Sequence, residues 1–128
     1  MAVVAVSGEP FPKSAQLSRG ERRYRRKVAS AKQWAAFKEA KREPCRVCEE
    51  RPGTSLHHVV PRDAPYFGDD VLANLAPVCI ECHPMLHLRE PKTCRDLCAS
   101  LTDAEYAYVI GKLGEGAFER VYGIEYGR

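Results

Sequence analysis

The sequence predicts a small α+β protein in which two short strands and a helix form a centre, preceded by a basic helix and followed by further helices. Two short apolar stretches flank a loop-rich segment, and signals for the start and end of helices surround them. The length of 128 residues suits one domain with a modest core. All four histidines and two CxxC pairs fall within residues 45–87, inside that centre.

Charge is divided unevenly along the chain. Residues 1–44 carry 11 lysines and arginines against 4 acidic residues, a net charge of +7, whereas residues 45–128 carry a net charge of −4. Such asymmetry is typical of a nucleic-acid-facing arm joined to a more neutral body. Residues 1–17 contain two prolines and no helical or strand period, so we expect a flexible lead-in there.

Residues 18–44 form the predicted basic arm, with a helix over about 19–42. Ser18 and Glu21 have the spacing of a capping box, apolar residues follow at helical intervals, and Pro44 ends the helix. The cationic residues at the start of this helix are candidate phosphate-binding residues: Arg22, Arg23, Arg25, Arg26 and Lys27. In isolation, a solvated helix face is the simpler interpretation of these charges.

Residues 45–90 form the predicted centre. Leu56–Val60 and Leu75–Cys79 have the composition of two antiparallel strands, and the segment between them has that of a loop. A helix should begin near His83, because Pro84 is tolerated only in a first turn, and run to about Arg89.

Residues 91–128 are expected to be a helical extension that packs on this centre. Thr102 and Glu105 form a second capping box, and a last helix over Ala117–Tyr122 is ended by Gly123. Cys94 and Cys98 lie four residues apart on a possible helix, where we interpret them as ordinary buried thiols.

The cellular compartment follows from the cysteines. The N-terminal residues lack the basic region and the long apolar run of a signal peptide, so we expect reduced thiols and an intracellular protein. This means the cytoplasm, or the host cytoplasm if the protein is phage-encoded. No stretch approaches the ~18 apolar residues of a membrane span, so no membrane partner is expected.

Two CxxC pairs predict a structural zinc site. Its four thiolate ligands would be Cys45, Cys48, Cys79 and Cys82. The 30 residues between the pairs exceed the roughly 15 to 20 of a zinc ribbon, so the enclosed segment must contain structure of its own. Unliganded core thiols and disulfides are the alternatives.

The histidines predict a second metal site. His83 and His87 are four residues apart on one helix face and can bind one ion together, whereas His57 and His58 are strand neighbours that point to opposite sides. One of this pair can join the metal while the other approaches a substrate. Packing or surface roles for the histidines are the alternative.

Four short motifs occur along the chain: His57-His58-Val-Val-Pro61, Asn74-Leu75 and Cys79-Ile-Glu-Cys82-His83, with the flanking Cys45-Arg-Val-Cys48. In this order they resemble the HNH endonuclease family, or ββα-metal nucleases. The resemblance covers about residues 45–90 and suggests a small phage-type member with a four-cysteine zinc site. It implies that His57 and His83 bind the catalytic metal, His58 is the general base, and Asn74 braces the loop and the base. His87 matches the extra helix ligand of the colicin-like branch.

This resemblance implies a metal-dependent DNA endonuclease that leaves 5′-phosphate and 3′-hydroxyl ends. The expected cofactors are a structural Zn²⁺ and a catalytic Mg²⁺ or Mn²⁺; histidine at position 57, where many members have aspartate, also suits Ni²⁺, Co²⁺ or Zn²⁺. Arg62, just beyond the first strand, is a candidate phosphate clamp, with a salt bridge or solvent exposure as alternatives. The expected partner is double-stranded DNA.

Two other functions explain part of the pattern. A non-catalytic, zinc-stabilised nucleic-acid-binding module accounts for the cysteines and the basic arm but leaves the histidine spacing unexplained. A phage packaging accessory protein, in contact with the packaging machinery, is the other alternative and is compatible with cleavage. The sequence leaves the oligomeric state open.

Overall fold

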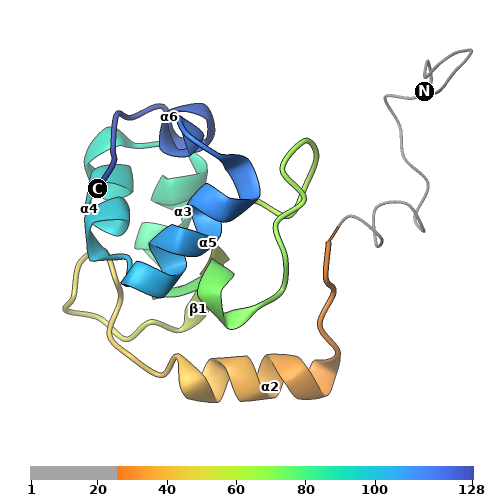
Figure 1. Cartoon of the computed structure of the whole chain (residues 1–128). Helices are drawn as coiled ribbons and strands as arrows, with labels where there is room; N and C mark the ends of the chain where they lie inside the picture. The colour runs from red at the N-terminus through yellow and green to blue at the C-terminus, as the bar shows by residue number, and fades with distance from the viewer. Residues whose placement is uncertain (1–25) are drawn as a thin grey trace, which may run out of the picture.

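A two-stranded sheet with helices packed around it forms the structure of residues 26–128, the part of the chain described by the computed structural model (Figure 1). Strands β1 (Ser55–His58) and β2 (Leu75–Val78) pair antiparallel, with His57 opposite Ala76 and His58 opposite Leu75. Helix α3 (Cys82–His87) follows β2 directly. The predicted α+β class and the strand-strand-helix centre are confirmed.

The connection between the strands returns close to β1. It ends in the 3₁₀ turn η2 (Leu72–Asn74), and Gly68 donates its N–H to the carbonyl of Pro61 (2.8 Å). A Cβ on Gly68 would lie 1.9 Å from the carbonyl oxygen of Val60, so only glycine allows this approach. The close approach holds residues 69 and 70 beside the end of β1.

Three helices follow α3, namely α4 (Pro91–Ser100), α5 (Asp103–Leu113) and α6 (Ala117–Tyr122). The predicted capping box of Thr102 and Glu105 begins α5, and Gly123 ends α6 with a φ of 71°, which glycine adopts without strain. Helix α4 contacts α3 and α6, while α5 contacts α6 and η2.

One hydrophobic core joins the strand region to these C-terminal helices. Its most deeply buried members include Val59, Val60, Val78, Leu86, Leu97, Val109, Phe118 and Val121. Cys94 and Cys98 are fully buried in the same core, as the ordinary-thiol interpretation predicts. The C-terminal helices therefore cover the centre instead of forming a separate unit.

Helix α2 (Ala31–Ala40) is shorter than the sequence predicts. Ser30 caps it, forming a capping box with Gln33, and residues 27–30 are extended, so the prediction of a helix over 26–30 is wrong. The expected apolar face is not buried either, since no residue of α2 is buried and Val28 is 49 % exposed. The predicted capping box at Ser18 and the lead-in over 1–17 lie outside the described residues.

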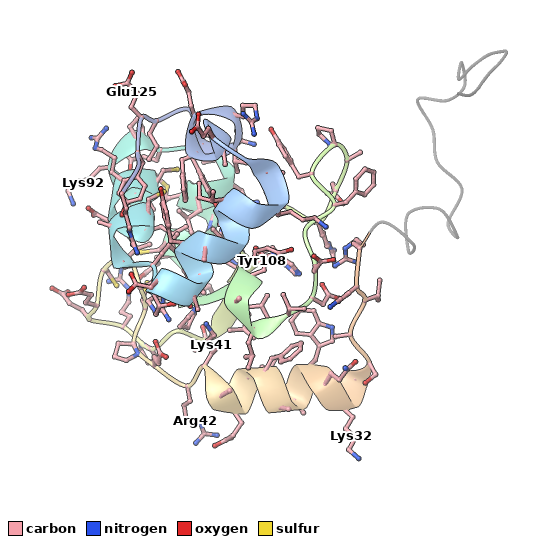
Figure 2. The ribbon with its side chains drawn as sticks, viewed as in Figure 1. Lys32, Lys41, Arg42, Lys92, Tyr108 and Glu125 are labelled. Atoms are coloured by element: carbon pink, nitrogen blue, oxygen red, sulfur yellow. The ribbon has the colours of Figure 1, made fainter. Side chains whose placement is uncertain are left out.

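Helix α2 lies beside the rest of the described chain (Figure 1). The Trp34 ring packs edge-on against Phe37 and against His58 of β1, with ring centroids 5.7 Å apart in each case. Lys32 and Arg42 project away from the other helices (Figure 2). At its C-terminal end, Lys41 pairs with the buried Glu105.

No helix in residues 26–128 has the length and apolar character needed to span a membrane.

Candidate metal centres and active site

Four cysteine thiols from two turns meet at one point, as the sequence predicts. Cys45 and Cys48 lie on the turn after Pro44, and Cys79 and Cys82 lie where β2 leads into α3. Their sulfur atoms all lie within 4.8 Å of one another, and those of Cys48 and Cys79 are 4.0 Å apart. Four thiols so placed are the donor set of a closed, tetrahedral zinc site.

The surroundings of these thiols favour a bound cation. The N–H of Val47 donates to the sulfur of Cys45, and that of Cys82 donates to the sulfur of Cys79. Although burial raises the pKa of Cys79, the side chain of Arg51 and backbone N–H groups lower it to about 6. Burial and the neighbouring thiols raise the pKa of Cys82 to about 12. A divalent ion relieves this mutual repulsion, so the thiols fit a structural zinc.

Three imidazoles form a second group. His57 belongs to β1, and His83 and His87 belong to α3. The centroid of the His57 ring is 5.3 Å from that of His83 and 5.6 Å from that of His87, and one nitrogen of each ring lies within 4.8 Å of the others. The Nε2 atoms of His83 and His87 are 3.1 Å apart, and two lone pairs at that distance need a proton or a cation between them.

Tyr122 determines which nitrogen of His57 is free. The Tyr122 hydroxyl donates its only proton to the carbonyl of Val59 (2.6 Å), so it must accept from Nε2–H of His57 (2.9 Å). The lone pair of His57 is therefore on Nδ1, a buried atom without a hydrogen-bond partner in residues 26–128. An orphaned imidazole nitrogen facing two further histidines is what a bound metal ion would satisfy.

Two of these histidines are held in the neutral form that binds metals. Burial, followed by repulsion from His83 and His87, lowers the pKa of His57 to about 3. Burial and His87 also lower the pKa of His83. Neutral imidazoles need no deprotonation before they bind an ion, and imidazole ligands suit ions such as Zn²⁺ and Ni²⁺.

His58 turns away from this group, as strand alternation predicts. Its Nε2 lies 2.8 Å from Oδ1 of Asp70. Burial lowers the pKa of His58, and Asp70 only partly opposes this effect. Both His57 and His58 nevertheless line one cavity of about 550 Å³, together with His83 and His87. A neutral imidazole and a metal-binding group therefore open onto the same space.

Asn74 braces the loop, but within residues 26–128 it makes no hydrogen bond to His58. Its Oδ1 accepts from the N–H of Val60 (2.7 Å), and its Nδ2 donates to the carbonyls of Val60 (3.1 Å) and Asp69 (3.0 Å). The loop-bracing geometry expected from the resemblance is present. The expected contact that would orient His58 directly comes from Asp70 instead, because the amide of Asn74 is fully engaged by the backbone.

The cationic residues divide into distinct groups. Arg62 is exposed and lines the cavity beside His58, without an ion pair among the described residues. The side chain of Arg26 is 12 % exposed and bonds to Asp70 and the Gly68 carbonyl, and its contact with phosphate stays a prediction. The Lys27 side chain is exposed. Arg22, Arg23 and Arg25 lie outside the described residues.

Sequence reasoning missed Asp70 and Tyr122. Asp70 lies in a segment with ordinary loop composition, and Tyr122 is 65 residues from the histidine that it contacts. Neither has a characteristic spacing from the histidines. The close approach at Gly68 brings Asp70 to the site, and the packing of α6 brings Tyr122 there. Neither contact can be predicted from the local sequence.

The spatial arrangement agrees with a comparison with known families. Residues 45–89 match the family model described as HNH endonuclease, a span that contains the four thiols, both strands and α3. No curated protein and no solved structure matches the chain. The family match indicates a nuclease or nucleic-acid-binding function. Residues 45–89, about a third of the chain, are therefore similar to an HNH endonuclease domain.

Proposed function

We propose that this protein is a metal-dependent endonuclease that hydrolyses phosphodiester bonds in double-stranded DNA, leaving 5′-phosphate and 3′-hydroxyl ends. The observation that carries the proposal is the opening of two histidine functions onto one cavity of about 550 Å³. One is the group of His57, His83 and His87, whose nitrogens converge. The other is His58, the next residue along β1, which faces a carboxylate instead.

The three converging histidines would hold the catalytic ion, either Mg²⁺ or Mn²⁺ or a softer ion such as Ni²⁺, Co²⁺ or Zn²⁺. When bound, the ion acts as a Lewis acid that offsets the negative charge growing on the phosphate and the leaving oxygen. His57 would bind through Nδ1, because Tyr122 engages its Nε2.

His58 would act as the general base by accepting a proton from the attacking water. A positioned general base typically contributes about 10² to 10⁴ in rate. Its lowered pKa supports this role, since the neutral ring can accept a proton near pH 7. Asn74 would contribute by holding the backbone of Val60 and Asp69, and so the loop beside the base.

The cysteine group would hold a structural Zn²⁺ that fixes the first turn to the start of α3. Because α3 carries His83 and His87, this ion would position two of the catalytic ligands without contacting the substrate. Structural and catalytic ions would then have separate tasks in one domain.

Contacts to the phosphate backbone would come from basic residues around the cavity and on the arm. Arg62 would clamp a phosphate beside His58, since it is exposed on the cavity wall. Further contacts would come from Arg22, Arg23, Arg25 and Lys27. These contacts would depend on charge and would not distinguish one DNA sequence from another. We therefore expect weak sequence preference.

Plasmid cleavage by the full-length, zinc-loaded protein tests this function. With Mg²⁺, Mn²⁺, Ni²⁺, Co²⁺ or added Zn²⁺, supercoiled DNA should become nicked or linear, and the new ends should be substrates for a ligase that requires 5′-phosphate and 3′-hydroxyl groups. His83→Ala should bind DNA normally and cut far more slowly. If the protein binds DNA but leaves it intact with every ion, the function is that of a non-catalytic binding module.

A further inference from the structure

Asp70 is a buried carboxylate on which donors from two separate parts of the chain converge. Its side chain is 4 % exposed. Oδ1 lies 2.8 Å from Nε2 of His58 and also accepts from the guanidinium of Arg26, while Oδ2 accepts from the N–H of Ala29 (2.9 Å). The N–H of Asp70 in turn donates to the carbonyl of Lys27 (2.8 Å).

These bonds determine which nitrogen of His58 carries the proton. A guanidinium and a backbone N–H can only donate, so both oxygens of Asp70 act as acceptors. The Nε2 of His58 must then carry the hydrogen that it shares with Oδ1. The lone pair of the neutral ring is therefore on Nδ1, and the ring lines the cavity that contains the metal-binding histidines.

We infer that Asp70 is a positioning residue for His58, which fixes the ring so that Nδ1 accepts the proton of the attacking water; this inference rests on the proposed nuclease function. The carboxylate would also stabilise the imidazolium that forms when His58 takes the proton. It would do so through its charge, without accepting the proton itself.

The segment before α2, residues 26–29, would hold Asp70 in place. Arg26 and Ala29 bond to the carboxylate, and the side chain of Arg26 also donates to the carbonyl of Gly68 (2.7 Å). Because both oxygens of Asp70 accept hydrogen bonds from residues 26–29, the carboxylate is held in the orientation in which it meets the ring of His58. Residues 26–29 thus act as a brace for the base.

Asp70→Asn tests the inference, with Asp69→Asn as the matched control. Asp69 is on the same loop and is bound by Tyr108, Lys112 and the N–H of Lys27, but among the described residues it makes no hydrogen bond to His58. In single-turnover cleavage by the full-length protein, Asp70→Asn should lower the rate about 10- to 100-fold without weakening DNA binding. Asp69→Asn should stay within about threefold of the wild type. Equal losses in both variants would reduce Asp70 to a loop-bracing residue and overturn the inference.

The tautomer of His58 gives a readout that does not depend on cleavage. Nitrogen-15 NMR of the full-length wild-type protein with Mg²⁺, assigned with His58→Gln, should show His58 protonated on Nε2. Protonation on Nδ1 would overturn the inference even if the enzyme is active. If the wild type does not cut DNA, the nuclease proposal fails, and with it the role of Asp70 in catalysis, whereas the tautomer still tests the bond between the two side chains.

Discussion

His57 and His58 are neighbours on one strand, yet each has its own oxygen partner. Tyr122 accepts from Nε2 of His57, and Asp70 accepts from Nε2 of His58, so both rings present Nδ1 as the free nitrogen. Strand alternation turns the two side chains to opposite sides, one toward His83 and His87 and the other toward Asp70. Two adjacent residues of one type can therefore perform different chemistry.

Tyr122→Phe should weaken binding of the catalytic metal by about 10- to 100-fold, because the ring of His57 loses the acceptor that fixes its tautomer. The fold should lose about 1 to 3 kcal/mol, because the carbonyl of Val59 and the Nε2–H of His57 lose their buried partner. Calorimetric titration of Mn²⁺ into the zinc-loaded protein measures the first effect, and urea unfolding measures the second. Tyr66→Phe, which loses a hydroxyl bonded to the Arg120 carbonyl, is the control. An unchanged Mn²⁺ affinity in Tyr122→Phe would remove Tyr122 from the site.

Residue types and spacing were sufficient to predict which thiols and imidazoles converge, but not the groups that orient them. The CxxC pairs and the spacing of His83 and His87 are local patterns, and the structure brings those side chains together as predicted. Asp70 and Tyr122 reach the site only through the folded loop and α6. The contacts of Asp70 and Tyr122 depend on tertiary packing, which produces no periodic pattern in the sequence.

Elements are also joined by an ion cluster around Glu105. This side chain is 1 % exposed and receives hydrogen bonds from Arg46, on the first cysteine turn, and from Lys41, at the end of α2. Although burial raises the pKa of Glu105, these donors lower it. The cluster ties α5 to the first cysteine turn.

Glu105→Gln should destabilise the protein by about 3 to 5 kcal/mol, because it leaves two buried cations without their counter-charge. The matched control is Glu39→Gln, which removes an ion pair with Arg42 whose side chains are 71 % and 78 % exposed. That change should cost less than about 1 kcal/mol. Urea unfolding of both variants compares them, and similar losses would contradict the structural role assigned to the cluster.

A deletion should separate the role of the basic arm in DNA binding from the role of residues 26–29 in holding Asp70. Removing residues 1–25 leaves the brace intact but removes Arg22, Arg23 and Arg25, so DNA affinity should fall and its slope against salt should flatten by up to about three units. Fluorescence anisotropy across sodium chloride concentrations measures this slope. Lys92→Ala, which removes a lysine paired with Asp96 on α4, should leave it unchanged. An unaltered slope after the deletion would exclude the arm from the DNA interface.

Helix ends were predicted correctly where local sequence signals determine them. They were predicted wrongly where hydrogen bonds to distant residues determine them. The capping box at Thr102 and the glycine at position 123 bound α5 and α6 as predicted. The sequence of the basic segment predicts one long helix. In the structure, Asp69 and Asp70 hold residues 27–29 by hydrogen bonds to the N–H groups of Lys27 and Ala29, and Ser30 caps the start of α2 instead. Residues 40 positions away along the chain thus set this helix start.

Across the whole molecule, the two proposed ions should contribute differently. A structural zinc contributes roughly 10 to 16 kcal/mol in small zinc-binding peptides, comparable with the ~5 to 15 kcal/mol stability of a whole domain. Removing zinc from the cysteine group should therefore unfold the centre, because the first turn and the start of α3 lose their connection.

Chelation of the full-length protein, followed by circular dichroism and zinc analysis, measures this dependence. Strong chelation should remove zinc and the folded signal together. His83→Ala, which affects only the histidine group, should retain zinc and the folded signal. A protein that loses zinc yet keeps its thermal transition would show that the core alone maintains the fold.

In the proposed mechanism, His58 activates water beside the three converging histidines. Single-turnover cleavage of DNA by His58→Ala tests this role, with Mn²⁺ affinity and DNA binding measured on the same preparation. We predict a loss of about 10² to 10⁴ in rate, with both affinities close to those of the wild type. Cleavage at the wild-type rate would contradict the assignment of the base and, with it, the proposed mechanism.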